Sequence, residues 1–204
     1  MNLSREQYAR LAKGSYGSQP IEGFDIDREL SNQNRTVYTK DGKAIISYRG
    51  TDVKNPWNRW KDLGTDALIA LGLQDEGSRF KNAEKYAKDT IQKYGAGNVE
   101  LTGHSLGGSQ ALYVSDKLGL PAKAFNPGVS PLTIEKKPGF GKELIGDVVN
   151  YVSPQPGTKT ESKAKVYTTG VDPISGSILF DRKGYDVELV KPKSWNVHGI
   201  TNFY

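Results

Sequence analysis

The spacing of apolar residues predicts a helix at the start of the chain. Tyr8 and Leu11 lie three residues apart, as on one face of a helix. Ser4 and Gln7 stand in the pattern of a capping box, in which each side chain bonds the backbone N–H of the other residue. Gly14 favours a helix end, because glycine readily takes the backbone conformation that closes helices. We expect a helix over about residues 5–14.

Strand-like patterns follow this helix. Residues 35–39 and 44–48 are rich in β-branched and aromatic side chains. Asp41 and Gly42 lie between them and give a strong hairpin signal, because both tolerate the positive φ of a tight turn. Apolar positions then recur at helical spacing over residues 78–94, and Gly95 ends that pattern.

The rest of the chain alternates strands with helices. A helix is expected over residues 109–118. The expected strands cover residues 99–102, 122–125, 148–152, 165–168 and 186–190. Such alternation is typical of an α/β domain with a mostly parallel central sheet flanked by helices. We predict a single domain over residues 1–204.

Composition narrows the function classes. The 204 residues are 36% hydrophobic and 25% charged, as in ordinary globular proteins. The absence of cysteine excludes disulfides, cysteine nucleophiles and cysteine-ligated zinc. The net charge of +5 would favour transient contact with an anionic lipid surface. No nucleic-acid motif accompanies it, so no nucleic-acid partner is expected. Neither a secretory signal nor a membrane-spanning run is present, so a cytoplasmic location is the default expectation.

One motif carries candidate chemistry. Gly103-His104-Ser105-Leu106-Gly107 fits the pattern G-x-S-x-G, and it follows an expected strand and precedes an expected helix. In α/β-hydrolases this strand–turn–helix exposes the serine hydroxyl above the sheet as a nucleophile. A phosphate-binding turn is disfavoured, because the chain lacks the P-loop lysine and the pattern G-x-G-x-x-G. We therefore expect an α/β-hydrolase fold with Ser105 as the nucleophile.

A serine nucleophile needs a base and an acid. The chain has two histidines. We interpret His104 as structural, because it adjoins Ser105 in the turn, which leaves His198 as the base. An acid between the serine and the histidine in sequence completes the usual order. Asp172 fits best, since it follows an expected strand and precedes a proline, while Asp181 and Asp186 are the competing candidates.

Several motifs in sequence order resemble the class 3 lipases, the family that includes the small fungal triacylglycerol lipases. The resemblance covers residues 11–204. Its motifs are Ile46-Ser47-Tyr48-Arg49-Gly50-Thr51, Asp62-Leu63-Gly64-Thr65-Asp66, the elbow at residues 101–108, Asp172-Pro173-Ile174, and His198-Gly199-Ile200-Thr201-Asn202-Phe203. The chain departs from the family at Leu63, where a tryptophan is usual, and its candidate lid is short.

The resemblance implies further site residues. Thr51 would donate to the oxyanion that forms on the substrate, and Asp66 would orient Thr51. The backbone N–H of Leu106 would be the second donor, which also follows from the elbow itself. Residues 53–60 occupy the place of the lid, where Trp57 and Trp60 either pack or face the acyl chain.

The combined pattern predicts a serine carboxylic-ester hydrolase that acts on lipid esters, as a triacylglycerol lipase or esterase. No cofactor or metal is implied. Phospholipase A1 activity, acyl transfer on the same scaffold and non-catalytic lipid binding remain as alternatives, because a fold does not fix its reaction.

Overall fold

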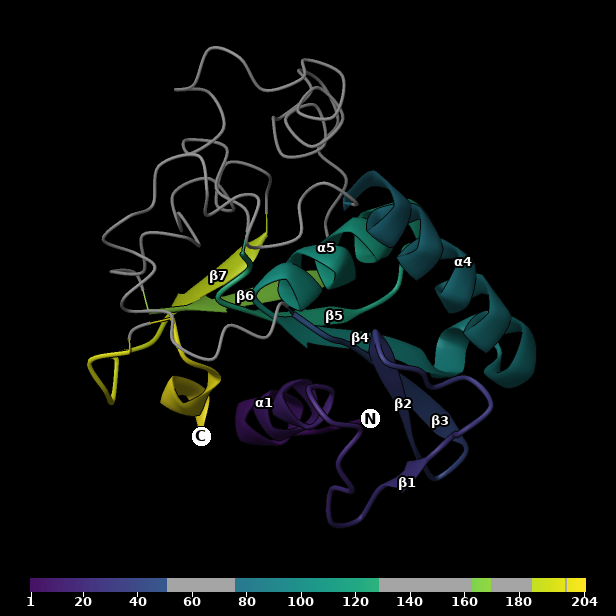
Figure 1. Cartoon of the computed structure of the whole chain (residues 1–204), viewed down its shortest axis with the longest axis horizontal. Helices are drawn as coiled ribbons and strands as arrows, with labels where there is room; N and C mark the ends of the chain where they lie inside the picture. Colours follow the sequence, from purple (N-terminus) through teal and green to yellow (C-terminus); the bar gives the residue numbers. More distant parts are fainter. Residues whose placement is uncertain (51–75, 129–162, 170–184, 197) are drawn as a thin grey trace.

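A computed structural model describes residues 1–50, 76–128, 163–169, 185–196 and 198–204. Within them, one sheet of seven strands runs in the order β1 to β7 (Figure 1). The strands are β1 (Asp25–Ile26), β2 (Arg35–Lys40), β3 (Lys43–Tyr48), β4 (Val99–His104), β5 (Ala122–Phe125), β6 (Ala164–Thr168) and β7 (Asp186–Leu189). The pairs β1–β2 and β2–β3 are antiparallel, and the four pairs from β3 to β7 are parallel. This mostly parallel sheet confirms the expected α/β-hydrolase-like fold.

The predicted hairpin joins the two antiparallel strands β2 and β3. Lys40 pairs with Lys43, so the loop consists of Asp41 and Gly42 alone. Their φ values are 50° and 73°. Positive φ at both loop residues gives a turn whose twist matches that of the flanking strands. The turn therefore fixes the register in which Val37 and Ile46 face the same core.

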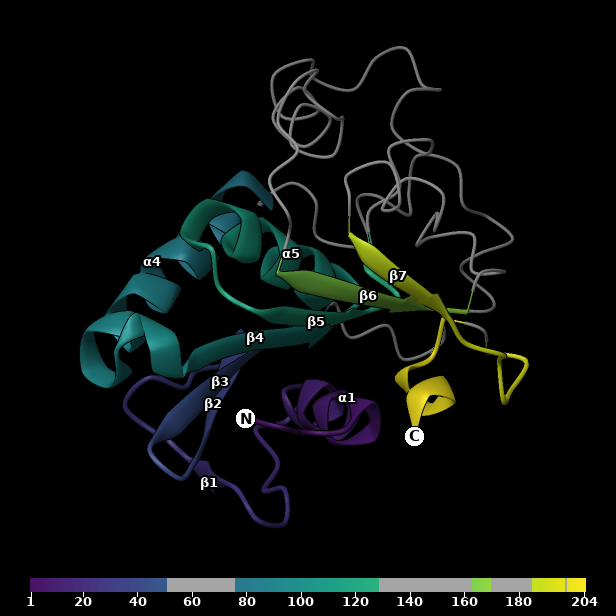
Figure 2. The ribbon, with the colours of Figure 1, turned by 180° about the vertical axis from the view of Figure 1, so that it is seen from behind.

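Helices cover both faces of the sheet (Figures 1 and 2). Helix α1 (Arg5–Gly14) begins with the predicted capping box of Ser4 and Gln7 and covers one face, beside the short C-terminal helix η3 (Ile200–Phe203). Helices α4 (Glu76–Tyr94) and α5 (Leu106–Leu118) cover the other face, with the short helix η2 (Ala96–Asn98) after α4. Crossovers between parallel strands are almost always right-handed, so two successive crossovers in the same direction, from β3 to β4 and from β4 to β5, are expected to place α4 and α5 on the same side.

Each face of the sheet has its own apolar cluster. Under α4 and α5 the buried side chains include Val37, Ile46, Ala87, Leu101, Leu112 and Val166. Under α1 and η3 they include Tyr8, Leu11, Ile45, Phe125 and Phe203. Because side chains alternate across a strand, Ile45 and Ile46 belong to opposite clusters. Tyr48 continues the first cluster and donates a hydrogen bond of 2.9 Å to the Ala83 carbonyl, which fastens α4 to the end of β3.

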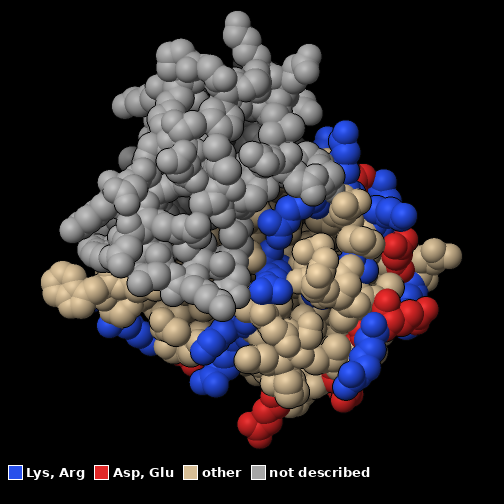
Figure 3. Space-filling view, viewed as in Figure 1, with Lys and Arg blue, Asp and Glu red and all other residues tan. Residues whose placement is uncertain are grey.

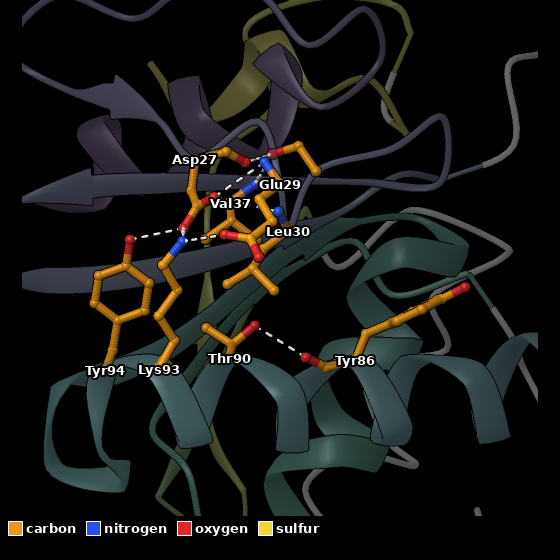
Figure 4. Close-up of polar contacts among 9 residues, drawn as sticks. Asp27, Glu29, Leu30, Val37, Tyr86, Thr90, Lys93 and Tyr94 are labelled. Atoms are coloured by element: carbon orange, nitrogen blue, oxygen red, sulfur yellow. Dashed lines mark hydrogen bonds and ion pairs between the residues drawn. The ribbon is translucent and has the colours of Figure 1, made fainter.

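A polar cluster fastens the far end of α4 to the loop between β1 and β2 (Figure 4). Lys93 contacts Asp27 at 2.9 Å and Glu29 at 2.7 Å, and the Tyr94 hydroxyl donates to Asp27 at 2.7 Å. Burial raises the pKa of Asp27, but the hydrogen bonds from Lys93 and Tyr94 outweigh it and hold that pKa below its usual value. The hydrogen bonds that Lys93 donates to Glu29 and Asp27 raise the pKa of Lys93.

Two elements at the elbow are longer than the sequence pattern suggested. Strand β4 extends to His104, and α5 begins at Leu106 rather than at Ser109. The two glycines at positions 107 and 108 hid this helical turn, because glycine is a poor helix former in isolation. The expected strand at residues 148–152 lies outside the described residues. None of the helices in the described part combines the length and the apolar character that a membrane crossing requires.

Candidate active site

Ser105 occupies the sharp turn between β4 and α5. It is the N-cap of α5, with φ 57° and ψ −131°, and it is 7% exposed. A residue with a side chain rarely takes a positive φ, so this backbone is strained. The Ser105 N–H donates to the Phe125 carbonyl of β5 at 3.1 Å, which helps to hold the strained turn against the sheet. The strand–turn–helix that the motif requires is thus present.

Two glycines of the motif allow close backbone contacts. A methyl group at Gly103 would lie 2.2 Å from the Gly107 carbonyl oxygen. One at Gly107 would lie 2.1 Å from the Tyr48 carbonyl oxygen at the end of β3. Both distances are well below any real contact of a side-chain carbon. Glycine at these positions therefore lets α5 start directly against β3 and β4.

Two further glycines flank Ser105. A methyl group at Gly128 would lie 2.8 Å from the Ser105 Oγ and 2.7 Å from the Leu106 nitrogen. One at Gly50 would lie 2.5 Å from the His104 carbonyl oxygen and 3.3 Å from the Ser105 Cβ. A side chain at position 128 would therefore overlap Ser105 and the first residue of α5, and glycine lets the loop after β5 pass directly against the turn.

His198 lies beside this turn although 92 residues separate it from Ser105 in the sequence. Its ring centroid lies 5.0 Å from that of His104, and its Nε2 atom is buried. The His104 Nε2 lies 2.6 Å from the His198 carbonyl oxygen, and the Tyr16 hydroxyl lies 2.9 Å from the His104 Nδ1. Because a carbonyl only accepts, the His104 Nε2 carries the proton, and the Tyr16 hydroxyl donates to Nδ1.

The interpretation of His104 as structural agrees with this arrangement, since both of its ring nitrogens bind other groups. His104 is fixed at the end of β4 and bonds the backbone of His198, so it ties the C-terminal segment to the elbow. The hydroxyl of Tyr16, just after α1, completes the chain of contacts. Tyr16 could not be predicted as a supporting residue, because no motif surrounds it and it reaches His104 from the end of α1.

The loop after β5 adds a second support that the sequence analysis did not find. Asn126 follows β5 with φ 38°. Its N–H donates to the Tyr167 carbonyl at 2.8 Å, and its Oδ1 accepts from the Thr169 N–H at 3.1 Å. These bonds join the loop that carries Gly128 to the end of β6, directly before residue 170. Asparagine takes a positive φ more readily than most residues, but the sequence does not show which asparagine lies in such a turn.

The structure places Ser105 and Leu106 in the turn itself, and it places His198 in contact with the adjacent His104. The others, Thr51, Trp57, Trp60, Asp66 and Asp172, lie outside the described residues. Within the described ranges, no group of three or more histidine, aspartate or glutamate side chains could hold a metal ion.

A comparison with known families agrees with the fold and the turn. Residues 8–153 match the Phospholipase-like family model, described as a Tle-like phospholipase domain. This range includes Ser105 and Leu106 and covers more than half of the chain. No curated protein matches. The family model supports the broader expectation of a lipase-type enzyme that acts on lipid esters, and it does so under a phospholipase name rather than that of the class 3 lipases. The chain belongs to the Phospholipase-like family.

Proposed function

We propose that the chain is a phospholipase that hydrolyses a carboxylic ester of a glycerophospholipid, with Ser105 as the nucleophile. The observation that carries this proposal is the strained turn between β4 and α5, in which Ser105 has φ 57° and is followed at once by Leu106, the first residue of α5. Such a turn puts a serine nucleophile next to a backbone N–H that can stabilise an oxyanion. The family name favours phospholipids among lipid esters.

The proposed mechanism transfers the acyl group first to Ser105 and then to water. The Ser105 oxygen attacks the ester carbonyl carbon and gives its proton to His198. The oxyanion accepts hydrogen bonds from the Leu106 N–H and, by the resemblance to class 3 lipases, from Thr51, which Asp66 would orient. His198 then protonates the departing alcohol of the lysophospholipid, and an acyl group remains on Ser105. A water molecule gives a proton to His198, attacks the acyl group and releases the fatty acid.

Asp172 is our proposal for the acid that orients His198. It follows β6, which ends at Thr168, and it precedes a proline. In this role its carboxylate accepts a hydrogen bond from the His198 ring and stabilises the imidazolium that forms during the attack.

A lipid surface is the proposed partner. Trp195 is 93% exposed and Leu189 is 67% exposed, and both lie in the segment that leads to His198. Lys191 and Lys193 are exposed beside them. An exposed tryptophan among lysines suits the boundary between headgroups and acyl chains of an anionic membrane. Trp57 and Trp60 remain our candidates for a short lid or an acyl-chain contact.

A triacylglycerol lipase is the second candidate, favoured by the class 3 lipase motifs. Four substrates separate the alternatives: phospholipid vesicles, a triacylglycerol emulsion, a soluble p-nitrophenyl ester, and phospholipid with an added alcohol as acyl acceptor. We expect fatty acid release from phospholipid above all. Faster release from triacylglycerol would favour the lipase, and transfer of the acyl group to the alcohol would favour an acyltransferase.

The role of Ser105 is tested with Ser105→Ala. Loss of the nucleophile of a triad typically lowers turnover by about a millionfold. A fluorophosphonate probe should label the wild type once and leave the variant unlabelled, while both unfold at similar temperatures. Failure of the wild type to react with the probe would instead support a non-catalytic lipid-binding protein.

A further inference from the structure

A buried arginine lies at the edge of the sheet with hydrogen-bond donors that the described residues do not use. Arg35 begins β2 and is 5% exposed. Its guanidinium lies over the Tyr86 ring of α4, 3.4 Å from the ring centroid. Its Nε and Nη1 atoms are buried, and neither has a hydrogen-bond partner in the described part of the chain. A buried charged donor without an acceptor is costly, so an anion that reached this guanidinium would stabilise it.

Arg35 also lines a cavity of about 30 Å³ that is partly open to solvent. Its lining includes Arg35 and Arg79, the amide side chains of Asn34, Asn82 and Gln110, and Tyr86. None of the described lining residues carries a carboxylate. The two arginines bring positive charge to this lining, and the amide residues add N–H groups to it. Planar guanidinium groups bind phosphate oxygens in pairs, which makes arginine the preferred residue for such anions.

The described residues place few charged groups around Arg35. Asp89, one turn further along α4 from Tyr86, is the carboxylate that acts on it electrostatically. Asp89 is exposed and does not line the cavity. Desolvation lowers the pKa of the Arg35 guanidinium, which shows that burial outweighs the support from its neighbours. An anion in the cavity would reverse this imbalance.

The size of the cavity fits part of a phosphate group. A water molecule needs about 10–15 Å³ of such space, so the cavity holds the centres of about two waters. A phosphate that enters from the open side would place two of its oxygens at these two positions. Its remaining oxygens would stay at the mouth, where Asn82 is exposed.

The cavity and the elbow lie at the same end of the strands, where β3 and β4 finish. Arg35 pairs with Tyr48, and Tyr48 pairs with Gly103. Two strand spacings therefore separate the Arg35 and Gly103 backbones, or about 10 Å. Figure 3 shows Lys and Arg side chains, in blue, in the middle of the view and next to the residues drawn in grey. Over α4 at the right of the same view, blue and red side chains alternate.

We propose that the Arg35 cavity binds a phosphate group, held by the guanidinium groups of Arg35 and Arg79 and by the surrounding amides. The phosphate is that of a phospholipid headgroup or a free phosphate ion. Both sources present the same oxygens to the arginines. The inference is independent of the proposed hydrolysis, because binding at this cavity requires no reaction at Ser105.

The test measures the melting temperature of the protein while inorganic phosphate or glycerophosphocholine is added at constant ionic strength. A ligand that binds only the folded state raises the melting temperature as its concentration exceeds its dissociation constant. We expect a saturable rise for the wild type. Stabilisation by glycerophosphocholine alone would identify the lipid headgroup as the source, and stabilisation by phosphate alone would identify the free ion.

Three variants locate the site. Arg35→Met should abolish the rise, and Arg79→Gln should weaken the apparent affinity at least about tenfold, since each loses charge-assisted bonds. Arg10→Met is the matched control, because Arg10 lies over the Tyr204 ring at 5.3 Å on α1, on the opposite face of the sheet. If Arg35→Met does not fold, Arg79→Gln decides by itself.

Two results would overturn the proposal. If neither compound raises the melting temperature of the wild type, the cavity holds water only. If Arg10→Met and Arg79→Gln reduce the rise equally, the anions bind the basic surface without a defined site. Because the readout is binding, either result leaves the proposed hydrolysis standing, and a lack of hydrolysis leaves this test intact.

Discussion

Replacement of Gly128 by alanine tests the geometry around Ser105 without a change in any candidate catalytic group. The added carbon would lie 2.7 Å from the Leu106 nitrogen, and 2.8 Å from both the Ser105 carbonyl carbon and the Ser105 Oγ. Ordinary contacts of such a carbon begin at 3.4 Å, so each distance is at least 0.6 Å too short. Two of these neighbours are backbone atoms at the start of α5, which cannot move without displacement of the turn.

Two consequences follow from this overlap. Overpacking of this kind typically destabilises a protein by about 1–3 kcal/mol. Most domains tolerate such a loss, since they are stable by about 5–15 kcal/mol. The methyl group would also crowd the Ser105 hydroxyl and the Leu106 nitrogen, to which we assign the nucleophile and an oxyanion donor. Loss of one oxyanion donor lowers turnover by about 100- to 1000-fold, and we expect at least that loss in Gly128→Ala.

The assay is hydrolysis of a soluble p-nitrophenyl ester, at a temperature at which circular dichroism shows that the variant is folded. Gly97→Ala is the control, because a methyl group at Gly97 would meet nothing within 4 Å and its backbone is not of the positive-φ type. We expect Gly97→Ala to keep wild-type activity. A folded Gly128→Ala variant with the activity of the control would refute the roles that we assign to the Ser105 hydroxyl and the Leu106 N–H.

Three further predictions concern other parts of the chain. Asp172→Asn should lower turnover by about ten-thousandfold, because asparagine favours the wrong histidine tautomer; a result near wild type in the ester assay would exclude Asp172 as the acid. Trp195→Ala should weaken binding to anionic vesicles in sedimentation assays but leave hydrolysis of a soluble ester intact, and equal losses in both would contradict a role at the lipid surface. Asp27→Asn should destabilise the protein by about 1–2 kcal/mol at neutral pH, because Asp27 accepts four hydrogen bonds and its side chain is 6% exposed. Since folding lowers the pKa of Asp27, the difference in urea stability should shrink as the pH falls below about 4 and be lost once the pH lies below the lowered pKa of the folded state; a difference that does not shrink with falling pH would contradict the ionic origin.

Local signals in the sequence were enough for most elements of the fold. The capping box at Ser4, the Asp41-Gly42 turn and Gly95 each act within a few residues, so their meaning does not depend on the rest of the chain. The elbow could be predicted for a related reason. Its two motif glycines are needed where α5 meets β3 and β4, and a strand before and a helix after them are visible as patterns.

The supports of the site could not be predicted in this way. Tyr16, His104 and His198 meet only because α1, β4 and the C-terminal segment converge, and their contacts span 88 and 94 residues. The same holds for the Arg35 cavity. An arginine that begins a strand usually points into water, and only the position of Tyr86 on α4 shows that this one is buried.

The positive φ of Ser105 affects the stability of the protein as well as the position of the hydroxyl. A side chain at φ 57° costs free energy of the order of 1 kcal/mol, which glycine would not incur. Ser105→Gly should therefore melt at a higher temperature than the wild type. The turn is then a position at which selection for stability alone would remove the hydroxyl, so its presence is a sign of selection for what that hydroxyl does.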